Sequence, residues 1–240
     1  MLGRKIMVPL LGLLVIVGAL IWLGHRAGAQ TTPTDPAQAT VPTGAPQKTT
    51  DPDDWRLTLV NPWHPLPEGY EPELTQIENG HQVDARCAAA LENMLAGFRD
   101  AGLSPLICSA YRTQEKQTSL YQNLVSKLIA RGYSQEDAQA KAGIEVAIPG
   151  TSEHQLGLAV DIVDLNHQVL DHTQEDTAVQ QWLMAHCWEY GFILRYPSDK
   201  SEITGIIYEP WHYRYVGEDY ALALRDAGLC LEEFLQTGSV

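Results

Sequence analysis

Apolar and polar positions alternate along the chain in blocks that predict both helices and strands. From Val83 to Ala101 the apolar residues recur at helical spacing, and Gly102 follows as a stop. Leu103 to Ala110 is a short apolar run typical of a strand. The same patterns predict helices over 113–131, 134–143, 179–190 and 221–235, and strands over 158–165 and 206–216. Because strict βαβ alternation is missing, we expect an α+β domain with a small, mostly antiparallel sheet flanked by helices.

Two N-terminal segments differ from this globular pattern. Residues 6–23 form an uncharged apolar run, preceded by Arg4 and Lys5, that is long enough to span a membrane. Ala27-Gly28-Ala29 also fits a signal-peptide cleavage site, so an uncleaved anchor and a signal removed after Ala29 both stay open. Residues 30–54 are rich in Thr, Pro, Ala and Gln and predict a disordered linker. The chain therefore divides into an anchor or signal (1–29), a linker (30–54) and one folded domain (55–240) outside the cytoplasm.

Charge and cysteine content narrow the possible partners. The formal net charge is −14, which disfavours nucleic acid and anionic membrane surfaces as partners. The four cysteines are an even number, as expected for disulfides in an oxidising compartment. None of them stands in a C-x-x-C motif, which argues against a structural zinc ribbon. We expect Cys187 and Cys230 to form a disulfide, with buried free thiols as the alternative.

A first polar cluster interrupts an apolar strand. Asp161 lies in the middle of the predicted strand 158–165, where a carboxylate is costly unless it is paired or binds a cation. His154 lies seven residues earlier, across Gly157, and can fold back toward it. The alternative is that Asp161 accepts hydrogen bonds from loop amides and that His154 is an ordinary surface histidine.

A second polar cluster lies at Glu209-Pro210-Trp211-His212. In a regular strand Glu209 and His212 would face opposite sides, but Pro210 favours a bulge that lets them converge. The alternative is that both decorate an aromatic strand. Taken with the first cluster, His154, Asp161 and His212 could bind zinc through three ligands and leave a fourth position open, as in hydrolytic zinc sites.

These motifs resemble a known family. Ser-x-His-x-x-Gly-x-Ala-x-Asp (Ser152 to Asp161), Glu-Pro-Trp-His (Glu209 to His212) and Ser-Ala-Tyr-Arg (Ser109 to Arg112) are similar to those of the VanY-type D-alanyl-D-alanine carboxypeptidases. These enzymes share a fold with VanX dipeptidases and the hedgehog signalling domain. The match runs in order from about Val83 to Leu235. Ala110 departs from it, because glycine is commoner there in the family.

The resemblance implies a role for each site residue. His154, Asp161 and His212 would hold one zinc ion per chain, with Glu209 as the catalytic base. Arg112 would bind the terminal carboxylate of the substrate through its planar fork. Gln117 and Ser152 are expected to form hydrogen bonds with the substrate. Trp211 is expected to form a pocket wall, with simple core packing as its alternative.

The implied activity is hydrolysis of the C-terminal D-Ala-D-Ala bond of peptidoglycan stem peptides by a monomer on the outer face of a bacterial cell membrane. Two alternatives remain: an L,D-carboxypeptidase acting on tetrapeptide stems, and a non-catalytic hedgehog-like module that binds wall peptide. Glu209 favours an enzyme, since a binding module needs no base. A serine peptidase is excluded, because the chain contains no S-x-x-K, K-T-G or G-x-S-x-G motif.

Overall fold

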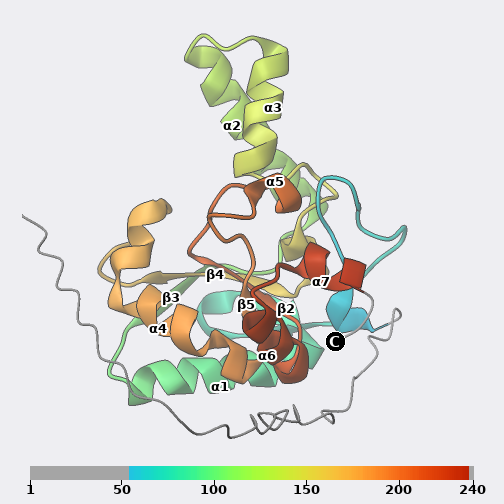
Figure 1. Ribbon diagram of the computed structural model, residues 1–240. Helices are drawn as coiled ribbons and strands as arrows, with labels where there is room; N and C mark the ends of the chain where they lie inside the picture. Colours follow the sequence, from blue (N-terminus) through green and yellow to red (C-terminus); the bar gives the residue numbers. More distant parts are fainter. Residues whose placement is uncertain (1–53, 238–240) are drawn as a thin grey trace, which may run out of the picture. The chain divides into compact units, whose positions relative to one another are not determined.

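A four-stranded antiparallel sheet lies at the centre of the computed structural model, which describes residues 54–237 (Figure 1). β4 and β6 form the middle of this sheet, and β3 and β5 form its edges. The strands, in spatial order, are β3 (Pro105–Ser109), β4 (Ala159–Asp164), β6 (His212–Tyr215) and β5 (Phe192–Leu194). A separate antiparallel pair joins β1 (Leu74–Gln76) to β2 (Gln82–Asp84). The two central strands are each hydrogen-bonded on both sides, so side chains on them are held more rigidly than those on the edge strands.

Helices cover the sheet and build the core. α1 (Ala85–Asp100) begins where the Asp84 side chain accepts a hydrogen bond from the Arg86 amide, which caps the helix. It buries Leu91 and Phe98 in the same cluster as the strand residues of β4. The other helices are α2 (Gln114–Ala130), α3 (Gln135–Glu145), α4 (Ala178–His186), α5 (Ser201–Thr204), α6 (Glu218–Ala227) and α7 (Leu231–Thr237).

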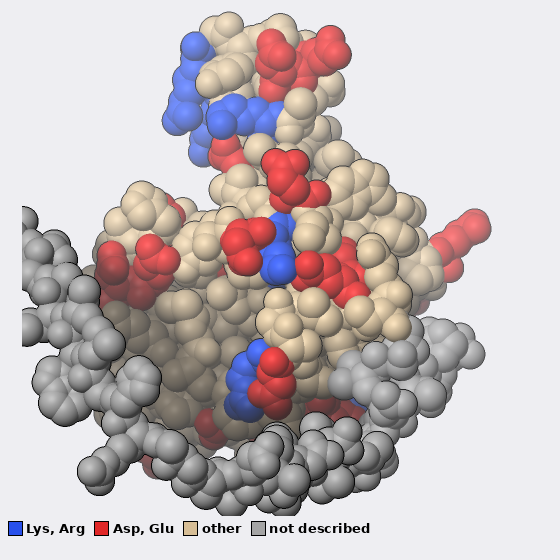
Figure 2. Space-filling view, viewed as in Figure 1, with Lys and Arg blue, Asp and Glu red and all other residues tan. Residues whose placement is uncertain are grey.

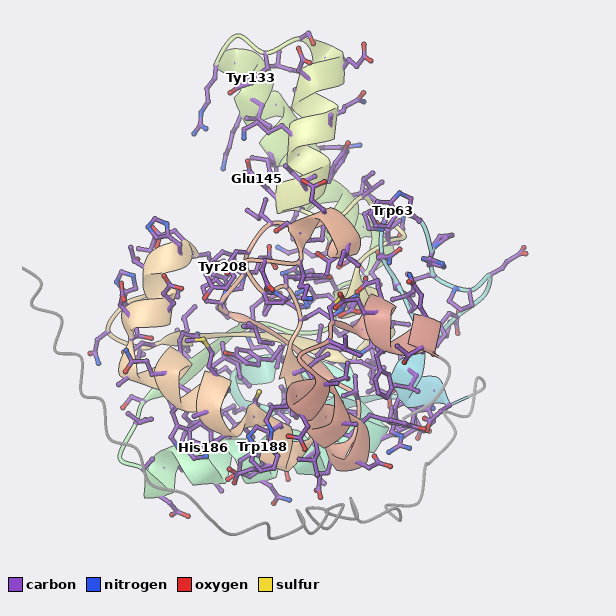
Figure 3. All side chains as sticks on the ribbon, viewed as in Figure 1. Trp63, Tyr133, Glu145, His186, Trp188 and Tyr208 are labelled. Carbon is purple, nitrogen blue, oxygen red and sulfur yellow. The ribbon has the colours of Figure 1, made fainter. Side chains whose placement is uncertain are left out.

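α2 and α3 form a hairpin that projects from the rest of the domain (Figure 1). Its own core is a small cluster of Val125, Leu128, Ala138 and Ala142. Tyr133 lies at the tip and is 44% exposed (Figure 3). Lys and Arg side chains follow one side of the hairpin, and Asp and Glu side chains lie on the other (Figure 2). The small cluster of buried side chains holds the two helices of the hairpin together.

The α+β class predicted from the sequence is confirmed, and two elements were predicted wrongly. The strand expected over 206–216 is restricted to β6, because a turn at Pro210 and Trp211 precedes it. The single helix expected over 221–235 is two helices, since α6 ends at Gly228 in the left-handed conformation (φ 64°). The short strands β1, β2 and β5 and helix α5 were not predicted, since three or four residues carry little periodicity.

The predicted Cys187–Cys230 disulfide is wrong. All four cysteines lie within the described residues, and all four are free thiols. Cys187 packs into the main core at the end of α4, whereas Cys230 precedes α7. Both line one largely apolar cavity of about 420 Å³ without forming a bond.

The anchor or signal predicted at 1–29 lies outside the described residues, as does nearly all of the predicted linker. Within residues 54–237, no helix combines the length and apolar character that crossing a membrane requires.

Candidate active site

Strand register brings the candidate residues together at the middle of the sheet. Asp161 on β4 lies directly opposite His212 on β6 and Ser109 on β3. A register shift between Ile107 and Ser109 marks an irregularity at this end of β3. Asp161 is only 2% exposed, so its carboxylate needs partners inside the protein.

His154 is oriented by the backbone. It lies in a short 3-10 turn (Glu153–Leu156) that ends at Gly157, whose φ of 76° turns the chain into β4. A Cβ at Gly157 would lie 2.9 Å from the Asp84 amide nitrogen, so only glycine fits there. Nδ1 of His154 donates to the Ala110 carbonyl at 2.7 Å. Nε2 therefore keeps its lone pair and faces Asp161 Oδ2 at 3.2 Å.

Glu209 and His212 converge through a turn. The His212 amide donates to the Glu209 carbonyl at 3.1 Å, which places their side chains on the same side. His212 Nδ1 lies 3.1 Å from Asp161 Oδ1 and 3.6 Å from Glu209 Oε2. The predicted convergence is therefore correct, but a turn before β6 produces it and not a bulge within a strand.

These side chains fit a zinc ion. Ligand atoms of His154, Asp161 and His212 all lie within 4.8 Å of one another, and all three residues are buried. Two imidazole nitrogens and one carboxylate oxygen form a donor set that zinc prefers in catalytic sites. The geometry leaves Glu209 beside this group, where it is not needed as a fourth protein ligand.

The electrostatics of the site follow from burial and from neighbouring charges. Burial raises the pKa of Glu209 to about 8, although His212 and Arg112 oppose the shift. Burial, helped by Arg112, lowers the pKa of His154 to about 4. Burial also disfavours the charged form of His212, but the nearby carboxylates of Asp161 and Glu153 outweigh it and raise the pKa of His212 to about 9. The site therefore holds a carboxylate that can exchange a proton near neutral pH.

Arg112 links the ligand group to the cavity. Its Nη2 donates to Asp161 Oδ2 at 2.6 Å and its Nε donates to Ser109 Oγ at 2.8 Å. Gln117 lies behind Arg112, fully buried, with its Oε1 3.4 Å from Nη1 and its Nε2 donating to the Ala147 carbonyl. Gln117 thus contacts Arg112 directly, and its side chain is shielded from solvent.

One cavity of about 350 Å³ collects these groups. Ser152 and Trp211 line it, and Trp211 is 8% exposed, so this side chain is both a wall and part of the packed interior. Leu120 and Leu124 of α2 add an apolar side. Seven of the eight predicted site residues line the cavity, namely Arg112, Ser152, His154, Asp161, Glu209, Trp211 and His212.

Sequence reasoning missed two further features. Tyr196 lines the cavity and packs its ring against His212, with centroids 4.7 Å apart. Beside His212 lies a buried ion cluster that we call the arginine cluster, formed by Glu153, Arg195, Arg214 and Glu232. A charge at 195 inside the apolar run 192–196 was the sequence signal for this cluster.

The chain is similar in sequence to known carboxypeptidases. The family model for VanY, D-alanyl-D-alanine carboxypeptidase, matches residues 80–218. A D-alanyl-D-alanine carboxypeptidase of Enterococcus faecalis is 46% identical over 187 residues, covering 78% of this chain and 68% of that protein.

The fold is also similar to those of solved carboxypeptidase structures. A mutant of the vancomycin resistance D,D-pentapeptidase VanY in complex with Zn(II) superposes with a TM-score of 0.70 at 45% identity, covering 76% of this chain and 99% of that one. The LdcB LD-carboxypeptidase superposes with a TM-score of 0.64 at 35% identity, covering 74% and 84%.

Proposed function

Because the chain belongs to the VanY D-alanyl-D-alanine carboxypeptidase family, we propose that residues 55–240 form a zinc peptidase domain that removes the C-terminal D-alanine from peptidoglycan stem peptides. The observation that carries this proposal is the convergence of three buried ligand side chains and one additional carboxylate, Glu209, in a single cavity. A module that only binds peptide has no need of that carboxylate.

The roles of the side chains follow from their positions. His154, Asp161 and His212 would hold zinc, which would supply a Lewis acid for the attacking water and for the scissile carbonyl. Glu209 is close to these ligands and its pKa is raised to about 8, so it can take a proton from the attacking water. The same carboxyl group then gives that proton to the amine of the departing D-alanine.

Arg112 gives the enzyme its preference for a free C-terminus. Three of its five N–H groups point to Ser109, Gln117 and Asp161, which leaves one N–H on each terminal nitrogen. These two groups donate to the substrate carboxylate, and Ser152 contributes a hydroxyl from the cavity wall. Gln117 acts through Arg112 by fixing its guanidinium.

Location and assembly complete the proposal. Residues 1–29 hold the domain at the outer face of the cell membrane, or export it if cleavage follows Ala29, and residues 30–54 act as a tether. The domain acts there as a monomer on the cell wall.

Product analysis tests the proposal. The purified full chain is incubated with zinc and three substrates: a pentapeptide stem ending in D-Ala-D-Ala, its C-terminal amide, and a tetrapeptide stem. Mass spectrometry should show loss of one alanine from the free pentapeptide only, and a chelator should stop the reaction until zinc is restored. An intact pentapeptide would contradict the proposal, whereas cleavage of the tetrapeptide alone would establish the L,D-carboxypeptidase that the likeness to LdcB also favours.

A further inference from the structure

Two buried polar atoms near the metal ligands are without hydrogen-bond partners. Within residues 54–237, the buried side-chain atoms that lack a hydrogen-bond partner are Glu153 Oε2 and His212 Nε2. They face each other at 3.7 Å, and both residues are at most 3% exposed. A shift of about 0.5 Å would bring them to the length of a hydrogen bond. Unpaired buried groups are costly, so an interaction between these two atoms is the simplest way to satisfy both.

The other oxygen of Glu153 is held firmly. Oε1 accepts from Arg195 Nε at 2.8 Å and from Arg214 Nη1 at 2.7 Å, and neither arginine is exposed. Arg214 also donates to the Arg56 and Thr58 carbonyls, which fixes it in turn. The plane of the Glu153 carboxylate is thus fixed from one side, and Oε2 is left directed at His212.

We propose that Glu153 is a positioning residue for His212: Oε2 accepts the Nε2 proton, so that the Nδ1 lone pair faces the metal. This inference rests on the zinc site of the proposed function. The two histidine ligands then use different supports, since the Ala110 carbonyl fixes the His154 tautomer and a buried carboxylate fixes that of His212.

A single substitution reverses this arrangement. In Glu153→Gln, the two arginine donors still require an oxygen at the Oε1 position. The amide NH₂ must then occupy the Oε2 position and donate to His212 Nε2. That hydrogen bond favours the tautomer with a proton on Nδ1, which competes with zinc for the same nitrogen.

Glu232→Gln provides a matched control. Glu232 is buried in the same arginine cluster and accepts two hydrogen bonds from Arg195, at 2.8 and 2.6 Å. It also accepts from Asn61 and forms none of the contacts of His212. The same change of Glu to Gln therefore disturbs the cluster without changing the hydrogen bonding of the ligand.

The experiment measures zinc affinity of the full chain by competition with a chromophoric chelator, and unfolding by denaturant on the same samples. We expect Glu153→Gln to weaken zinc binding 10- to 100-fold, and Glu232→Gln to change it by no more than about twofold. Equal zinc affinity in Glu153→Gln and parent, or an equal loss in both variants, would overturn the inference. A parent chain that bound no zinc would instead overturn the proposed function itself, and this inference with it.

A measurement on the unsubstituted protein keeps the test decisive if Glu153→Gln does not fold. Proton NMR of the cobalt-substituted full chain should show an exchangeable proton on Nε2 of His212 that is protected from solvent, as a buried hydrogen bond to Glu153 requires. Coordination through Nε2, or rapid solvent exchange of the Nε2 proton, would overturn the proposal.

Discussion

The β4–β6 strand pair and the α2–α3 hairpin contribute to the same cavity but are stabilised in different ways. Asp161 and His212 pair across two central strands and are almost fully buried. The hairpin projects from the domain and buries only a small cluster of its own (Figure 1). Leu124 of α2 nevertheless lines the same cavity as His154, Asp161 and His212.

This difference separates two tasks. The proposed ligands and base lie where strand pairing and buried ion pairs restrict motion, as precise chemistry requires. The apolar side of the cavity comes from the α2–α3 hairpin, which buries few side chains of its own. Such an element is expected to open locally at a lower free energy than the central sheet. Substitutions in the strand pair should therefore change metal binding and kcat, whereas those in the hairpin should change KM.

The largest effect is expected for His154→Ala. Loss of one of three protein ligands should remove zinc and lower kcat/KM at least ~10³-fold, since several kcal/mol of transition-state stabilisation depend on the metal. Zinc content by atomic absorption and product release are the measurements. His172→Ala, at an exposed position, is the control and should resemble the parent. Full zinc content in His154→Ala would contradict the assignment.

Arg112→Lys should come next. Lysine keeps the charge but cannot contact Ser109 and Asp161 while donating two hydrogen bonds to the substrate carboxylate. KM should rise about tenfold or more, since a hydrogen bond to a charged group contributes ~1.5–3 kcal/mol. Steady-state kinetics measure this, with Arg99→Lys, 63% exposed in its side chain, as the control. Unchanged KM would show that Arg112 does not bind the carboxylate.

Leu124→Ala tests the hairpin side. Shortening this wall should raise KM about threefold to tenfold, because each buried methylene contributes ~0.8 kcal/mol, and should leave kcat and zinc content near those of the parent. Ile129→Ala, on the same helix but 40% exposed, is the control. A fall in kcat with unchanged KM would mean that the hairpin shapes the chemistry as well.

The smallest effect concerns acid stability near the strand pair. Burial alone raises the pKa of Glu232, but Arg195 and Asn61 outweigh it, so the folded pKa lies below 4.5. The stabilisation is therefore complete above 4.5 and is lost as pH falls toward the folded value. Denaturant unfolding of the metal-free protein from about pH 6 to about pH 3 should show a shallower decline in Glu232→Gln than in the parent. Parallel declines would contradict this account.

Sequence patterns predicted the long elements and most of the site. α1, α2 and α3 were found because their apolar faces recur over three or more turns. Asp161 was identified because a carboxylate inside an apolar run must have a partner. The site residues were then named by the resemblance of their motifs to a known family.

The remainder depended on tertiary contacts that no local pattern contains. The arginine cluster joins residues 37 to 61 positions apart, so the partner of Glu153 could not be read from its neighbours. The turn before β6 depends on one backbone hydrogen bond, between the His212 amide and the Glu209 carbonyl. The bulge expected at Pro210 would have brought the same two side chains together, so the sequence could not distinguish the two. The free Cys187 and Cys230 thiols follow from how α4 and α7 pack, which spacing does not determine.

Glu209→Gln tests the central claim, that a base distinct from the three ligands performs the chemistry, most directly. Glutamine keeps the size of the side chain but cannot accept the proton, so zinc content and stem-peptide binding should match the parent while kcat falls at least ~10²-fold. Glu189→Gln is a matched control, because Glu189 also pairs with a histidine three residues away, His186, but on the surface. Zinc loss in Glu209→Gln, or hydrolysis at the parent rate, would contradict the account.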